Sequence, residues 1–253
     1  MAWAYDSASH NSNTFKAASS SKDTSTFTIS PAANTTAGDR VFLYIGAIHR
    51  AGAAPTVSSI TDPRSNSWHQ DAYHTFTDSS DNGFVAIWSA QIATQILSTD
   101  TLTVNLSSTA RKSGLMLLEY SGLDTSTTPV DVSASNGVTS SNATVTSGTT
   151  PATGAANELV IRVYGDDGWN IAWGTAPAGT VEINGMPSGS WSQWWSDQNS
   201  GSSGATATLS GTMASATTWA CATVVYKLAG AAVVFQPPPI VTSLQAVNRS
   251  ANF

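Results

Sequence analysis

The feature that most constrains the fold of this chain is an internal repeat of short strand-like segments. Segments of matching pattern occur in the same order in the two halves of the sequence. The pairs are YDSAS (5–9) with VDVSAS (130–135), TFTIS (26–30) with ATVTS (143–147), GDRVFLYIGA (38–47) with ANELVIRVYG (156–165), VSSIT (57–61) with TVEIN (180–184), TLTVNLSS (101–108) with TATLSGT (206–212), and SGLMLLEYSG (113–122) with WACATVVYKLAG (219–230). This order predicts two copies of one structural unit.

The composition of the chain indicates that the unit is made of β-strands. Only 10% of the residues are charged, and the abundant Thr and Val favour strands. Asn-Gly pairs, typical of hairpin turns, occur at 82–83, 136–137 and 184–185. We find no long segment with helical periodicity. We therefore expect an all-β fold with a duplicated antiparallel β-sandwich.

Three regions are expected. They are a first sandwich repeat over residues 1–123, a second over 130–228, and an extended C-terminal arm over 229–253. Each repeat has roughly 100–120 residues and about seven strands, the size of an immunoglobulin-like or jelly-roll sandwich. The sequence leaves open whether the repeats form two tandem sandwiches or one larger one.

The C-terminal arm is apolar and rich in proline, unlike most free tails. Its three consecutive prolines enforce an extended conformation and end any strand pairing. We expect the arm either to fold back on its own domain or to dock on a neighbouring subunit. The residues expected to make the docking contact are Val234, Phe235, Pro237, Pro238, Pro239, Ile240 and Leu244.

Several classes of function are disfavoured by the sequence. The basic residues are scattered and the net charge is −6, so nucleic acid is not expected as a partner. The N-terminus lacks the pattern of a signal peptide, and no apolar run is long enough for membrane insertion. The single cysteine, Cys221, cannot form an intrachain disulfide and is expected to be buried. No catalytic, metal-binding or cofactor-binding motif is present, so we expect neither enzymatic activity nor a cofactor.

Tryptophans and nearby acids are the best candidates for ligand binding. The segment GDDGWNIAWG (165–174) places Trp169 and Trp173 beside Asp166 and Asp167 in what is expected to be a loop. Aromatic rings with Asp and Asn side chains suit a neutral sugar surface, and the acid pair could also hold a hard cation. The alternative is that this loop folds over the end of the sandwich and its indoles are buried there.

A second tryptophan cluster lies in the segment WSQWWSDQ (191–198), which aligns with FVAIWSAQ (84–91). In this alignment Trp191 and Trp195 share one strand face and take the places of Phe84 and Trp88, so we interpret both as core. Trp194 matches Ile87 on the opposite face. We expect that face to meet the other half or a neighbouring subunit, which leaves Trp194 as a further candidate for contact with a ligand.

Four segments together resemble a β-sandwich region of actinobacterial phage minor tail proteins. They are PTVSSITDPRSNSWHQ (55–70), GFVAIWSAQI (83–92), LLEYSGLDTSTTPVD (117–131) and ANELVIRVYG (156–165). The resemblance spans about residues 20 to 228 and does not include the C-terminal arm. Its motifs are structural, such as the turn at Thr61 and Asp62 and the strand end from Glu119 to Gly122. It implies a virion structural component and no catalytic residue.

We therefore expect a non-enzymatic structural protein of a bacteriophage virion, either a minor tail protein or a capsid decoration. Its expected partners are other virion proteins and further copies of itself, with a trimer as one option. The expected location is the surface of the particle, on the tail or the capsid. The alternative is a carbohydrate-binding, host-adhesion module that presents exposed tryptophans to a glycan on the host cell surface.

Overall fold

The computed structural model describes residues 2–16, 23–50, 52–77, 81–167, 173–177, 181–185 and 192–230. The described residues form sixteen strands and no helix. The first eight strands are β1 (Ala4–Lys16), β2 (Thr24–Ile29), β3 (Arg40–Arg50), β4 (Val57–Thr61), β5 (Trp68–Thr77), β6 (Asp81–Gln91), β7 (Leu102–Ala110) and β8 (Lys112–Ser121). The other eight are β9 (Val130–Gly137), β10 (Asn142–Thr149), β11 (Leu159–Asp166), β12 (Trp173–Thr175), β13 (Val181–Gly185), β14 (Ser192–Asn199), β15 (Thr208–Thr217) and β16 (Trp219–Tyr226).

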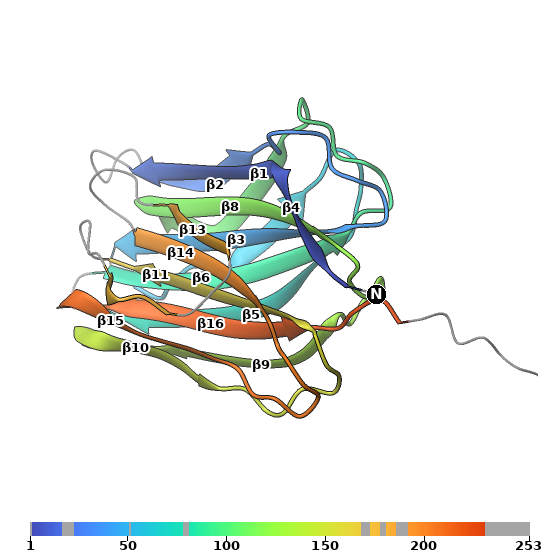
Figure 1. The fold of residues 1–253 in the computed structure, drawn as a ribbon. Helices are drawn as coiled ribbons and strands as arrows, with labels where there is room; N and C mark the ends of the chain where they lie inside the picture. Colours follow the sequence, from blue (N-terminus) through green and yellow to red (C-terminus); the bar gives the residue numbers. More distant parts are fainter. Residues whose placement is uncertain are drawn as a thin grey trace, which may run out of the picture.

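The strands form four antiparallel sheets, two in each half of the chain (Figure 1). The first half has a five-stranded sheet of order β1-β8-β3-β6-β5 and a three-stranded sheet of order β2-β7-β4. The second half repeats this plan, with β9-β16-β11-β14-β13 and β10-β15-β12. Every strand of the second half therefore occupies the place of the strand eight positions earlier, which confirms the expected all-β, duplicated β-sandwich fold.

The pairing within each half is nested. The first strand pairs with the last, the second with the second last, and the third with the third last: β1 with β8, β2 with β7, and β3 with β6. This is the order of a jelly roll, in which a long hairpin is rolled up into two sheets. Of the two sandwich types expected from the sequence, the topology thus matches the jelly roll.

The two sandwiches pack through their five-stranded sheets. One of the two large clusters of buried apolar side chains draws on both sheets, with Phe42, Tyr44 and Met116 from the first and Ile161 and Trp195 from the second. A separate cluster fills the first sandwich between its own two sheets, and smaller clusters fill the second. The molecule is therefore two sandwiches stacked face to face as four layers, which decides between the two arrangements that the sequence left open.

This stacking explains why the central strands are apolar along their whole length. All residues of β11 and β16 are buried, as are nine of the ten residues of β8. In β8, Leu115 and Leu117 point into the first sandwich, whereas Met116 and Leu118 point toward the second. Both faces of these strands lie against protein, so they lack the alternation of a sheet that has one face in water.

One pair of matched segments is placed differently by the sheet order. The segment 57–61 forms β4, whose counterpart in the second half is the short strand β12 rather than the segment 180–184. The latter overlaps β13, which is the counterpart of β5. Each half has eight strands where about seven were expected, because β5 and the short β12 are not among the matched segments.

Candidate functional site

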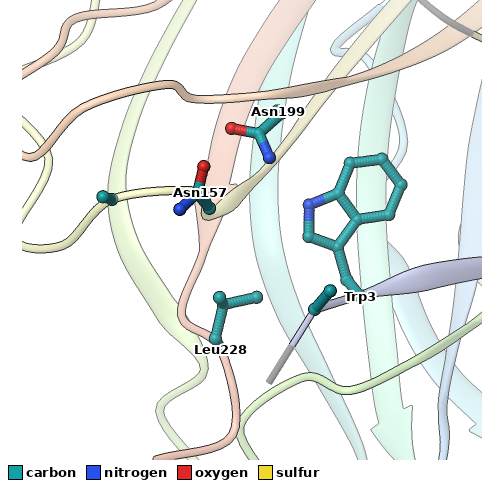
Figure 2. A pocket seen from close by; sticks show the side chains of 6 residues that line it. Trp3, Asn157, Asn199 and Leu228 are labelled. Atoms are coloured by element: carbon teal, nitrogen blue, oxygen red, sulfur yellow. The ribbon is translucent and has the colours of Figure 1, made fainter.

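A pocket of about 690 Å³ opens at the end of the molecule where β1 begins and β16 ends (Figure 2). Figure 1 shows that the N-terminal end of the described chain lies close to the end of β16. The pocket is lined by residues from both sandwiches, Ala2, Trp3, Ala156, Asn157, Asn199 and Leu228. We refer to it as the Trp3 pocket.

The position of Trp3 is set by a close approach of the chain to Gly122. Gly122 has a positive φ of 76°, and a Cβ atom at this position would lie 2.3 Å from the carbonyl oxygen of Ala2. Only glycine therefore allows the N-terminal segment to pass here. The indole of Trp3 then packs edge-on against the ring of Tyr120, with the ring centroids 6.0 Å apart.

Leu228 is held by a short bridge between the ends of the two sandwiches. Leu123, which follows β8, pairs with Leu228, which follows β16. The flanking N–H groups of Asp124 and Ala229 donate to the carbonyl oxygens of Lys227 and Gly122, each at 2.9 Å. This wall of the pocket is consequently tied to the same turn that positions Trp3.

The two asparagines of the pocket lie near neighbouring strand ends of the second sandwich, Asn157 shortly before β11 and Asn199 at the end of β14. Asn157, before β11, has a φ of 63°, a conformation that asparagine tolerates better than most residues. Its N–H donates to the carbonyl oxygen of Gly201 at 2.7 Å. The Asn199 Oδ1 atom accepts from the N–H of Gly201 at 2.8 Å. Gly201 therefore fixes both residues, Asn157 through its backbone and Asn199 through its side-chain oxygen, and both exposed side chains line the pocket.

The described polar groups that line the pocket are neutral. None of its six lining residues carries a charge. The Nε1 atom of Trp3 is buried without a hydrogen-bond partner, and it lies on the side of the ring that faces Asn157 and Asn199 (Figure 2). The pocket thus combines an indole N–H donor and two amides with the apolar surfaces of the Trp3 ring and Leu228. Such a set can bind an uncharged ligand that has both apolar faces and hydroxyl or amide groups.

The structure corrects the expectation for Trp194. Its side chain is only 2% exposed and lies in the core of the second sandwich with Tyr164, Trp219 and Cys221. Trp195, by contrast, packs between the two sandwiches. The faces of the two tryptophans are therefore the reverse of those expected, and neither indole is available at the surface. Trp191 lies outside the described residues.

Of the two tryptophans expected in the loop 165–174, the structure describes Trp173 but not Trp169. Trp173 lies in β12 and is half-buried, with its ring centroid 4.8 Å from that of Tyr164 and 5.7 Å from that of Trp194. It thus covers the core of the second sandwich, as the alternative interpretation of this segment expected. Trp169 lies outside the described residues.

The pair Asp166 and Asp167 makes structural contacts rather than forming a loop-tip cation site. Asp166 is the last residue of β11 and is fully buried, with its Oδ2 atom accepting from the Tyr164 hydroxyl at 2.7 Å. Asp167 accepts from the Nζ atom of Lys112 at 2.7 Å and pairs with Arg111. Because both cations belong to the first half, Asp167 joins the two sandwiches. Among the described residues no three His, Cys, Asp or Glu side chains form a metal-binding group.

Buried hydrogen bonds between the sandwiches were not expected from the sequence. Tyr120 of the first half donates to Asp197 of the second at 2.9 Å, and Tyr226 of the second donates to Asp71 of the first at 2.9 Å. Trp195 Nε1 donates to the Tyr120 hydroxyl at 3.1 Å. Burial raises the pKa of both hydroxyls well above the usual value and also raises the pKa of Asp71. The two hydroxyls therefore stay protonated and act as permanent donors.

Two smaller cavities, of about 230 and 460 Å³, lie beside the link between the halves and share His69 and Thr127. Arg40 reaches this region from β3, and its guanidinium donates to the carbonyl oxygens of Asp124 and Ser126, each at 2.8 Å. The buried guanidinium of Arg40 thus fixes the link between the halves, residues 124–129, and is not free to bind a ligand in these cavities. We therefore consider the Trp3 pocket the better candidate for ligand binding.

The seven residues proposed for the docking contact of the arm, from Val234 to Leu244, lie outside the described residues. In the described part of the chain no helix is long and apolar enough to cross a membrane. Comparisons with family models, with curated proteins and with solved structures find no significant match to this chain.

Proposed function

We propose that the chain is a non-enzymatic structural component of a bacteriophage virion, on the surface of the tail or the capsid. The sequence resemblance to a β-sandwich region of phage minor tail proteins supports this proposal. The jelly-roll order of both halves agrees with it by analogy, because jelly rolls are common in viral capsids as well as in lectins. Its partners are other virion proteins and further copies of the chain.

The observation that carries the proposal is the way in which the buried polar groups are used. The hydroxyls of Tyr120 and Tyr226 each bond a carboxylate of the other sandwich, and Asp167 pairs with Lys112 across the same boundary. Asp71, Asp167 and Asp197 therefore serve to hold the two sandwiches together. A rigid double sandwich is suited to a building block of a particle.

The apolar C-terminal arm is the proposed assembly contact, and its removal tests the function. A chain truncated after Gly230 is expected to fold normally, because the described strands end at Tyr226. It should nevertheless fail to enter particles when it replaces the full chain in a complementation assay. Copy number in purified particles, measured by quantitative mass spectrometry, is the readout.

A matched control replaces residues 231–253 with a Gly/Ser tail of equal length. It should fail like the truncation if the apolar side chains of the arm make the contact. Circular dichroism and thermal unfolding of all three proteins exclude a folding defect. Incorporation of the truncated chain at the copy number of the full chain would contradict the proposed role of the arm.

A further inference from the structure

We infer that the Trp3 pocket binds a neutral carbohydrate, such as one or two sugar residues of an uncharged glycan. The inference does not depend on a virion location. It also differs from the adhesion site expected from the sequence, because Trp194 is buried in the core and Trp173 covers it.

The unpaired indole N–H of Trp3 is the first argument for a ligand. Nearly all buried donors in proteins have a partner, and leaving one without a bond costs free energy. The Nε1 atom of Trp3 is buried, has no partner, and lies on the side of the ring that faces the amides of Asn157 and Asn199 (Figure 2). A hydroxyl group of a bound sugar would supply the missing acceptor once the indole shifts to expose Nε1, which has almost no accessible area in the free chain.

The second argument is the combination of surfaces in the pocket. A pyranose has apolar C–H patches and a rim of hydroxyl groups that both donate and accept. The ring of Trp3 and the side chain of Leu228 match the patches, and the amides of Asn157 and Asn199 match the hydroxyls. A volume of about 690 Å³ lies within the range of about 300–1,000 Å³ typical of small-molecule sites.

The third argument is the absence of charge from the described residues of the lining. Anionic ligands, such as phosphates or uronic acids, find no cation among the six lining residues, and the net charge of −6 opposes their approach. A purely apolar ligand would leave the indole N–H and the amides unsatisfied. A neutral, hydroxyl-rich molecule meets both conditions.

Apart from this shift of the indole, the walls of the pocket are organised before any ligand binds. Gly122 places Trp3, the Leu123–Leu228 bridge places one wall, and the contacts to Gly201 place both asparagines. Because the walls belong to both sandwiches, the site exists only when the halves are packed together. Little ordering is then lost on binding, which favours measurable affinity for a small ligand.

The test uses the full chain and a panel of neutral di- and trisaccharides of glucose, galactose and N-acetylglucosamine, with an oligogalacturonate as the charged comparison. Binding is measured by isothermal titration and by the shift of the Trp3 indole N–H resonance in NMR spectra. We expect saturable binding of at least one neutral saccharide, a shift of that resonance, and no binding of the oligogalacturonate.

Two substitutions separate a ligand contact from a structural role. Trp3→Phe keeps a ring against Tyr120 but removes the N–H, and Asn157→Gly removes the amide while allowing the positive φ. Each should weaken binding about fivefold to tenfold with thermal unfolding nearly unchanged. Trp68→Phe is the matched control, since it removes another buried and unpaired indole N–H that is not in the lining of the pocket, and it should leave affinity unchanged.

Three outcomes would overturn the inference. They are no saturable binding by any neutral saccharide, binding that Trp3→Phe and Asn157→Gly leave unchanged, and binding that appears only after truncation at Gly230. The last result would show that the C-terminal residues of the chain itself occupy the pocket. Because binding is measured on the purified chain, none of these outcomes depends on incorporation into particles.

Discussion

At the scale of single residues, Glu158 makes the stability of the chain depend on pH. Burial, with repulsion from the nearby Asp131, raises the pKa of this carboxyl group from 4.5 to about 7. Its Oε2 atom is buried without a hydrogen-bond partner. Between these two pKa values the folded chain holds a proton that the unfolded chain has lost. Stability therefore falls as the pH rises through this window and becomes level above it.

This dependence is measurable by comparing the chain with Glu158→Gln. In urea unfolding between about pH 5 and pH 8, the free energy of unfolding of the unsubstituted chain should fall more steeply than that of the variant. Asp131→Asn is the control, since removing the repulsion should move the fall to lower pH. Parallel pH profiles for the chain and Glu158→Gln would show that Glu158 is not the group responsible.

The residue scale also shows why the Trp3 pocket was not predicted. Its three polar residues, Trp3, Asn157 and Asn199, are far apart in the sequence, and only the packing of the sandwiches brings them together. The sequence does reveal a cluster of tryptophans at 191–195, but two of these are core residues. Tryptophan density indicates where large side chains are buried, whereas a site depends on which polar groups are left unpaired.

At the scale of strands, the order of the elements was predictable but the face of each residue was not. Aligning WSQWWSDQ with FVAIWSAQ identified β14 correctly as the counterpart of β6. It matched Trp195 with Trp88, yet Trp195 packs between the sandwiches, where Ile87 lies in the first half. A shift of one residue moves every side chain to the other face. Both faces of these strands are apolar, so the sequence shows no alternation of polar and apolar residues. Without that alternation, the alignment could be shifted by one residue.

Contact between two edge strands leads to a prediction at this scale. β5 of the first sandwich meets β9 of the second, and the N–H of Thr77 donates to the carbonyl oxygen of Val138 at 3.0 Å. A Cβ atom at Gly137 would lie 2.1 Å from the carbonyl oxygen of Thr75. Gly137→Ala should therefore push the two edges apart and lower the free energy of unfolding by about 1–3 kcal/mol.

Chemical denaturation measures this loss, and hydrogen exchange of the Thr77 amide locates it. The matched control is Gly230→Ala, because a Cβ atom there would meet no atom within 4 Å. The control should stay within about 0.5 kcal/mol of the unsubstituted chain. A similarly small effect of Gly137→Ala would show that the edges can separate at no cost.

At the scale of the whole molecule, the large face shared by the sandwiches should make them depend on each other for stability. In the first sandwich this face carries Phe42, Tyr44, Ile87, Met116 and Leu118, all fully buried. Burying a large apolar side chain contributes about 1.5–3 kcal/mol, so these five contribute on the order of 10 kcal/mol. That is comparable with the entire stability of a typical domain, about 5–15 kcal/mol.

We therefore expect residues 1–123 expressed alone to aggregate or self-associate, and the full chain to unfold in a single transition. Light scattering coupled to size-exclusion chromatography and denaturation followed by two probes test these expectations. A variant of residues 1–123 with Tyr44→Ser, Met116→Thr and Leu118→Thr should be more soluble than the unsubstituted half, because the exposed face is then less apolar. If the unsubstituted half is instead a stable, folded monomer, the sandwiches are independent units and the shared face serves only to orient them.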